Sequence, residues 1–322
     1  MMFLRFLFVL ALSFALVPAA WAQGYPSKPV RVIVTFPPGG TPDIYGRIMS
    51  IELAKAWNQS VVVENRTGAG GTIGTDCVAK ASPDGYTLLF AADASITIAP
   101  HLYSKIPYDP VRDLAPIVNV AAGPFVLMAN PAFPPNNVKE LIALVQTQPG
   151  KVSYASSGAG GQQHLAMEYI RTMAGSMDMI HVPYKGFGQG IADVLANQVP
   201  LIFGGITASI QLTRSGRLKA LGVTGPKRAK ALPNVAAIAE TLPGFDITAW
   251  YGFMAPAGTP REIVKKIHDD SVAVIRRPDF LERLDKDGIE PVGNTPEEFA
   301  AQIRNDLAHW AKIVKAAGAK LD

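Results

Sequence analysis

The chain has 322 residues, which is long enough for about two domains of ordinary size. Hydrophobic residues make up 48% of it and charged residues only 17%, a balance that excludes an intrinsically disordered chain. The 30 Lys and Arg against 26 Asp and Glu leave a formal net charge of +4 with no basic run, so nucleic acid is not an expected partner.

The first 22 residues have the pattern of a secretory signal peptide. Arg5 precedes an apolar run over residues 6–17, and Ala20-Trp21-Ala22 forms a small-residue cleavage site. A permanent membrane anchor is the alternative, but the run is short against the ~20 residues that a spanning helix needs. We therefore expect cleavage before Gln23 and export of the rest. The single cysteine, Cys77, cannot form a disulfide within the chain.

Strand-like and helix-like segments alternate in the exported part. The first group has β-branched strands separated by segments of helical periodicity, at residues 30–36, 42–57, 61–64, 72–79 and 87–90. The second group has expected strands at residues 125–129, 152–155, 181–182, 199–203 and 218–223. Its expected helices lie at residues 138–146, 162–173 and 190–196. This alternation predicts an α/β fold with mostly parallel sheets covered by helices.

Two late helices carry start signals. Thr259 and Thr295 are each followed by Pro and, three residues later, by Glu, which predicts a capping box at each position. After the second box an apolar stripe repeats at helical spacing, and we expect it to pack against the core: Phe299, Ile303, Leu307, Trp310 and Val314.

Two glycine-rich loops carry most of the functional information. Each begins at the end of a predicted strand and leads into a predicted helix, one over residues 35–43 and one over residues 154–164. The first N–H groups of a helix have no partner within it, and together with the helix dipole they favour an anion. Ser156 and Ser157 add hydroxyl donors to the second loop. Either loop alone is also compatible with an ordinary strand-to-helix turn.

Known nucleotide and catalytic motifs do not fit these loops. Gln163 stands where a dinucleotide fingerprint starting at Gly158 needs its third glycine, and Ile73 does so for a register starting at Gly68. A carboxylate is therefore the preferred anion. No G-x-S-x-G elbow, H-E-x-x-H motif or metal-ligand spacing of histidines occurs, so we expect no enzyme activity, no cofactor and no metal.

Two further side chains have competing interpretations. His164 directly follows the second loop, where it either contacts a ligand or packs and caps the helix. Lys185 is either a cationic ligand contact or an exposed lysine in a turn.

Several ordered motifs resemble one known family. They run from residue 25 towards the C-terminus as Tyr25-Pro26-Ser27-Lys28-Pro29, Phe36-Pro37-Pro38-Gly39-Gly40, Val61-Val62-Val63-Glu64-Asn65-Arg66-Thr67-Gly68-Ala69-Gly70-Gly71, Pro83-Asp84-Gly85-Tyr86-Thr87-Leu88, Tyr154-Ala155-Ser156-Ser157-Gly158, His164-Leu165-Ala166, Val182-Pro183-Tyr184-Lys185-Gly186, Ala255-Pro256-Ala257-Gly258-Thr259-Pro260 and Pro296-Glu297-Glu298-Phe299. With these motifs the chain resembles the substrate-binding proteins of tripartite tricarboxylate transporters, called Bug or TctC-like receptors.

The resemblance implies a periplasmic binding protein of the Venus-flytrap type, with two α/β lobes joined by two crossing strands. It places residues 23–120 and 248–322 in the first lobe and residues 121–247 in the second. The chain is expected to leave the first lobe near Val120 and to return near Thr248. We expect a monomer in the periplasm that binds a small organic carboxylate and works with two membrane permease subunits.

The resemblance also implies a set of ligand-binding residues. A ligand carboxylate would be held by main-chain groups and water at the first loop and by the second loop opposite, with further contacts from neighbouring turns. The residues at the matching positions are Pro38, Gly39, Gly40, Asp43, Gly70, Ser156, Ser157, Gly158, His164, Lys185, Gly204 and Gly205.

One position departs from the family pattern. After the predicted strand at residues 199–203 many members carry Asp-Asn, whereas this chain has Gly204-Gly205. The missing acid argues against an amino acid ligand and leaves room for a larger or aromatic carboxylate. Two alternatives stay open: a carboxylate sensor that signals to a membrane protein, and an exported hydrolase that uses Ser156 or Ser157 with His164.

Overall fold

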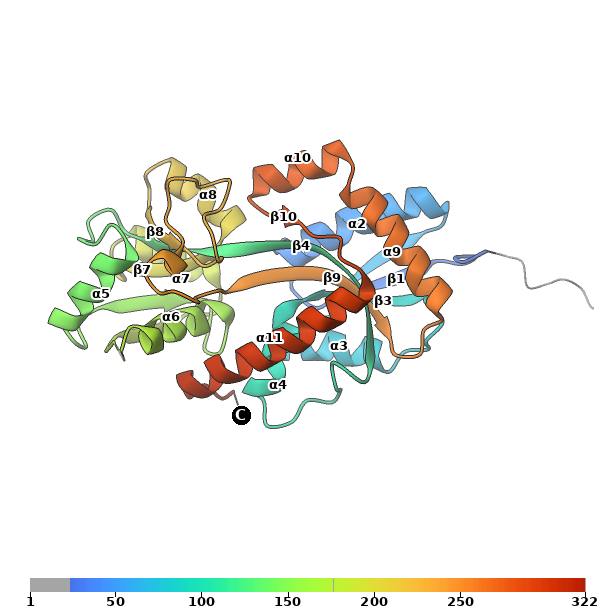
Figure 1. The fold of residues 1–322 in the computed structure, drawn as a ribbon, viewed down its shortest axis with the longest axis horizontal. Helices are drawn as coiled ribbons and strands as arrows, with labels where there is room; N and C mark the ends of the chain where they lie inside the picture. Colours follow the sequence, from blue (N-terminus) through green and yellow to red (C-terminus); the bar gives the residue numbers. More distant parts are fainter. Residues whose placement is uncertain (1–23, 176, 322) are drawn as a thin grey trace, which may run out of the picture.

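The computed structural model describes residues 24–175 and 177–321, so the expected signal peptide lies outside the described residues. Two α/β lobes lie side by side and two long strands pass between them (Figure 1). The strands are β1 (Val30–Val34), β2 (Val61–Asn65), β3 (Thr87–Ala92), β4 (Leu114–Ala129), β5 (Ser153–Ser156), β6 (Ile180–Pro183), β7 (Leu201–Gly205), β8 (Lys219–Val223), β9 (Thr248–Pro256) and β10 (Glu290–Pro291).

Helices cover the sheets on both sides. The α-helices are α2 (Thr41–Trp57), α3 (Thr72–Ala79), α4 (Ala99–Leu102), α5 (Val138–Thr147), α6 (Gln162–Met173), α7 (Phe187–Leu195), α8 (Ile206–Arg214), α9 (Arg261–Ile275), α10 (Pro278–Asp287) and α11 (Pro296–Ala317). Three short helical segments complete the set: η1 (Ala69–Gly71), η2 (Ala94–Ile98) and η3 (Ile238–Glu240). This mixed architecture confirms the α/β fold that the alternating sequence pattern predicts.

The first lobe is built on the parallel strands β2, β1 and β3, in that spatial order. Because the chain goes from β1 to β2 on one side and then back across β1 to β3, the direction of winding reverses between β1 and β3. Ligands of such sheets bind at this reversal, outside the carboxyl ends of the strands. In this lobe the relevant ends are the residues after Val34 and after Ala92.

The second lobe has the same strand arrangement. Strands β7, β5 and β6 are parallel neighbours, and β5 pairs with both of the others. The winding therefore reverses between β5 and β7, at the residues after Ser156 and after Gly205.

Strands β4 and β9 join the two sheets. Residues Leu114–Pro124 of β4 pair antiparallel with β9, and Phe125–Ala129 pair with β7, so a single strand belongs to both sheets. Strand β9 in turn pairs antiparallel with β3. The sequence alone predicted only the last five residues of β4.

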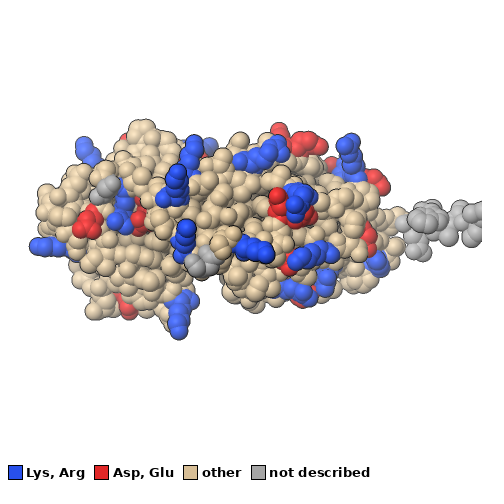
Figure 2. All heavy atoms as spheres, turned by 90° about the horizontal axis from the view of Figure 1, so that it is seen from below, with Lys and Arg blue, Asp and Glu red and all other residues tan. Residues whose placement is uncertain are grey.

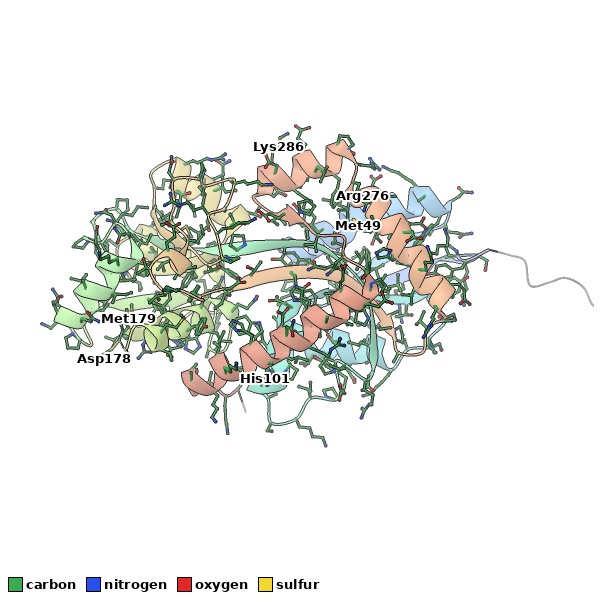
Figure 3. All side chains as sticks on the ribbon, viewed as in Figure 1. Met49, His101, Asp178, Met179, Arg276 and Lys286 are labelled. Carbon is green, nitrogen blue, oxygen red and sulfur yellow. The ribbon has the colours of Figure 1, made fainter. Side chains whose placement is uncertain are left out.

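Helix α11 runs along both lobes and packs against α4, β4 and α6 (Figure 1). Its apolar stripe is buried as predicted, with Phe299 and Ile303 in the core around Trp250 and with Trp310 and Val314 in the core of the second sheet. His101 of α4 lies beside this helix (Figure 3). One continuous helix thus stabilises the packing of both lobes.

Helix starts show both successes and errors of the predictions. Thr295 caps α11, since its hydroxyl accepts from Glu298 N at 3.2 Å and Glu298 Oε2 accepts from Thr295 N at 2.9 Å. The capping box predicted at Thr259 is wrong. Helix α9 begins two residues later, and the Thr259 hydroxyl donates a hydrogen bond to Pro256 O instead. Helices α8 and α10 were not predicted. Among the described residues, no helix is both long and apolar enough to span a membrane.

The close approach of β4 and β9 gives a first prediction. A Cβ atom at Gly252 would lie 2.5 Å from Val118 O and 2.9 Å from the Phe299 ring, so Gly252→Ala forces the crossing strands and α11 apart. We expect the free energy of unfolding in urea to fall by about 1–3 kcal/mol. Gly188→Ala is the control, because a Cβ there meets nothing within 4 Å. Equal stability of both variants would contradict this packing account.

Candidate functional site

The two winding reversals meet at the contact between the lobes. Asp93 directly follows β3, and its Oδ2 accepts a hydrogen bond of 2.6 Å from Nε2 of Gln162, the first residue of α6. Asp93 is only 1% exposed. The carboxyl ends of the two sheets therefore face each other, and the space between them is the candidate ligand cleft. Sequence analysis did not select either residue, although an acid directly after the third strand of a βαβαβ unit was a readable signal.

The first loop is ordered by an acid of its own helix. Asp43 Oδ2 accepts from Gly39 N at 3.0 Å, and its Oδ1 accepts from Arg47 and Asn65 at 2.9 and 2.8 Å. Burial opposes ionisation, but these donors together hold the pKa of Asp43 below its ordinary value. Asp43 therefore stabilises the loop from within, and Pro38, Gly39 and Gly40 are exposed at its surface.

Gly39 has φ +84°, a left-handed conformation that favours glycine. Gly40, rather than Thr41, is the N-cap of α2, and no side chain caps this helix start.

The second loop folds back on Ser156. The Ser156 hydroxyl lies 3.1 Å from Gly158 O, 3.2 Å from Gly158 N and 2.7 Å from His181 Nε2. The Ser157 hydroxyl is occupied by the side chain of Gln163. Helix α6 then begins after Gly161, again with no side-chain cap.

His164 and His181 form a stacked pair behind this loop. Their ring centroids are 3.9 Å apart with an interplanar angle of 8°, and Tyr154 stacks on His181. His164 Nδ1 accepts from Gly160 N at 3.1 Å, so this imidazole holds the loop from the side away from its surface. Burial lowers the pKa of both histidines, and the neighbouring His164 helps to lower that of His181 to about 4. Both rings are therefore neutral at pH 7.

The arrangement does not suit a hydrolase. The hydroxyl next to an imidazole is that of Ser156, which is 0% exposed, and its partner is His181 instead of His164. A nucleophile must reach its substrate, and this oxygen is enclosed by its own loop.

The two glycines after β7 have different surroundings. A Cβ at Gly204 would lie 2.7 Å from both Met128 and Ser209, so this position faces the core of the second lobe. A Cβ at Gly205 would meet nothing within 4 Å. Gly205 is also the N-cap of the unpredicted helix α8, which likewise has no side-chain cap.

A small cavity between the lobes lies beside the starts of α2 and α8. It is lined by residues of both lobes, including Thr41, Gly205, Thr207 and Tyr251, and its volume is about 10 Å³. That space holds at most about one water molecule. The two lobes are therefore in close contact at this place.

Two of the sequence-derived positions lie at the margins of this arrangement. Gly70 is exposed in η1 with φ +64°, and a Cβ there would be 3.6 Å from the Tyr103 ring. Lys185 is exposed in the turn after β6, which also places Tyr184 O near Gly158.

A larger cavity lies elsewhere, where β10 pairs with β4, between α10 and the loop after β8. Its volume is about 490 Å³, and we call it the waist groove; its charged lining residues are Lys227, Arg228, Lys230, Asp246, Asp285 and Glu290. None of the residues selected from the sequence lines it. No group of three or more potential metal ligands occurs in residues 24–175 and 177–321.

Comparison with known proteins assigns the family. Residues 46–319 match the tripartite tricarboxylate transporter family receptor TctC, so the chain belongs to this family of solute-binding proteins. BugT of Bordetella pertussis is 36% identical over 303 residues, which cover 93% of this chain and 92% of BugT.

Solved structures agree with this assignment. The R. palustris protein Rpa4515, solved with adipate, is 32% identical with a TM-score of 0.83 over 92% of this chain and 100% of its own. The periplasmic binding protein BugD is 36% identical, with a TM-score of 0.79 over 92% and 99%. MatC of Rhodopseudomonas palustris with bound malate is 29% identical, with a TM-score of 0.78 over 90% and 100%. These neighbours confirm the two-lobed periplasmic binding protein fold.

The histidine pair makes stability dependent on pH. The folded-state pKa of His181, about 4, lies below the ordinary value of 6.5, so the unfolded chain binds more protons between these pH values. The free energy of unfolding should therefore fall as the pH decreases from 6.5 to 4. His181→Gln removes one titrating group, and urea denaturation at several pH values should give a shallower decline. An unchanged slope in the variant would contradict the buried neutral pair.

Proposed function

We propose that this protein is a periplasmic receptor that captures a small dicarboxylate between its lobes for uptake by a tripartite tricarboxylate-type transporter. The observation that carries the proposal is the set of three helix starts at the interlobe contact. Helices α2, α6 and α8 begin after Gly40, Gly161 and Gly205, each without a side-chain cap. Unpaired N–H groups at such starts bind carboxylates.

Two other helices have side-chain caps, whereas α7, α9 and α10 also begin without one. Asn137 caps α5 and Thr295 caps α11 through their side chains. A side-chain cap would use the N–H groups that an anionic ligand needs, whereas a glycine leaves them free and lets the ligand approach the backbone. The proposal therefore depends on where the starts of α2, α6 and α8 lie and not on the missing caps alone.

The surface charge favours an anion as well. The chain has a formal net charge of +4. Figure 2 shows the narrowing between the lobes from below, with more Lys and Arg than Asp and Glu beside it. Such a surface attracts small anions towards the contact between the lobes.

The ligand class follows from the neighbours and from Gly205. The neighbours solved with adipate and malate bind diacids of different length. Open space at Gly205 supports a cleft that admits a diacid chain without a bulky side chain in its way. We assign the binding surface to Pro38, Gly39, Gly40, Ser157, Gly158 and Gly205, with Asp43, Ser156 and His164 as residues that hold the two loops. Gly70 and Lys185 lie at the margins of this surface, and Gly204 faces the core of the second lobe next to it.

Delivery to a transporter requires the lobes to open and close. We propose lobe boundaries at residues 120 and 248, which lie inside β4 and at the start of β9, so that these two strands form the hinge. The signal peptide of residues 1–22 would direct the protein to the periplasm, where it would act as a monomer with two membrane subunits.

A first test compares acids with their esters. A ligand that binds only the folded protein stabilises it by about 2.7 kcal/mol at 100 times its Kd. Adipate or malate should therefore raise the melting temperature, while the dimethyl ester of the same acid should not. Equal shifts for acid and ester would refute recognition by the helix starts.

A second test places a side chain in the cleft. Gly205→Val and Gly40→Val keep backbone angles that any residue adopts, with φ of −57° and −75°, and a Cβ finds room at both positions. Both variants should fold, while calorimetric titration should show a dicarboxylate Kd at least about tenfold higher, or 1.4 kcal/mol. Gly188→Ala serves again as the control. Wild-type affinity in both folded valine variants would place the ligand elsewhere.

A further inference from the structure

One acid at the interlobe contact has no partner for part of its carboxyl group. Asp93 Oδ2 accepts from Gln162 across the contact, but Asp93 Oδ1 is buried and makes no hydrogen bond to any described residue. Asp93 directly follows β3, at the winding reversal where α/β sheets bind their ligands. A polar atom without a partner at this place needs an explanation.

Among the described residues, no Lys, Arg or His forms an ion pair with Asp93. The titratable groups that face it are Asp306 from α11 and Tyr251 from β9, and His309 of α11 faces Asp306 in turn. A buried acid without a cation becomes neutral rather than keeping its charge.

The geometry also locates the proton. Oδ2 is occupied as an acceptor of the Gln162 N–H, so the proton of a neutral Asp93 belongs on Oδ1, the atom without a partner. Burial, and then the charge of Asp306, hold the pKa of Asp93 well above its usual range, which agrees with a neutral group. An O–H donor on Oδ1 requires an acceptor, and a carboxylate is a strong one.

We propose that Asp93 binds the ligand as a neutral carboxylic acid, donating a hydrogen bond from Oδ1 to one carboxylate of a diacid whose other carboxylate lies at the glycine helix starts. This inference rests on the proposed function and deepens it, because it makes the protein a receptor for a diacid together with one proton. It also disfavours ligands with an ammonium group, which would require an ionised Asp93.

Proton linkage gives the expected pH dependence. A hydrogen bond from the neutral acid to a carboxylate raises the pKa of Asp93 further in the complex, so binding takes up a proton once the pH exceeds the pKa of Asp93 in the free protein. Adipate is itself ionised above about pH 6. Above the pKa of Asp93 in the free protein, the Kd for adipate should therefore rise with pH, by up to about tenfold per pH unit.

Asparagine provides a sharp test, because its amide has the shape of a carboxylic acid and also donates a hydrogen bond, but does not titrate. We would titrate the full exported protein with adipate by calorimetry at several pH values, for the wild type, Asp93→Asn and Asp93→Ala. Asp93→Asn should bind within about threefold of the wild type at pH 6 and lose the pH dependence. Asp93→Ala should weaken binding by about 10- to 100-fold at pH 6.

Two controls separate this effect from general changes. Asp178→Asn removes an exposed acid at the far end of the second lobe and should leave both affinity and pH dependence unchanged (Figure 3). Hexanoate lacks the second carboxylate and should bind more weakly, without the pH dependence. Melting curves establish that each variant is folded.

The outcomes are distinct. Loss of adipate binding in a folded Asp93→Asn protein, or a rise of the Kd with pH that is the same in Asp93→Asn as in the wild type, would overturn the neutral-donor role and leave carboxylate capture intact. The same pH slope with hexanoate as with adipate would overturn the selection of a diacid. Failure of the wild type to bind any dicarboxylate would overturn the proposed function itself.

Discussion

The antiparallel pairing of β4 with β9 is the constraint on which the rest of the structure depends. Because β4 pairs first with β9 and then with β7, the two sheets share one continuous strand, and their relative orientation follows from its register. That orientation places the carboxyl ends of β1 and β3 opposite those of β5 and β7. Helix α11, buried against both cores, supports the same arrangement from outside the sheet.

The chemistry of the contact follows from this geometry. Helices α2, α6 and α8 begin after Gly40, Gly161 and Gly205 without a side-chain cap, and our proposal uses their backbone N–H groups as the ligand donors. The side chains that surround the loops act mainly as supports: Asp43 orders the first loop, and the stacked histidines hold the second. The proposed backbone recognition would suit acids of different length, such as the adipate and malate of the two solved neighbours.

Local sequence signals predicted most elements but not their meeting points. The β-branched run of β1, the stripe of α11 and the Thr295 box are patterns within one segment, and each appears in the structure. Asp93 and helix α8 were missed, since their importance arises from strand order and from contacts between segments far apart in the chain. The Thr259 box failed because the same residues also suit a turn that precedes the helix.

A crystal structure of the exported protein with bound adipate tests the central claim most directly. The account predicts one carboxylate of adipate within hydrogen-bond distance of backbone N–H groups at the starts of α2 and α8, between Thr41 and Gly205. It also predicts that the cavity of about 10 Å³ widens to enclose the ligand. Adipate bound in the waist groove beside Lys227 and Lys230, with the interlobe contact still closed, would contradict the account.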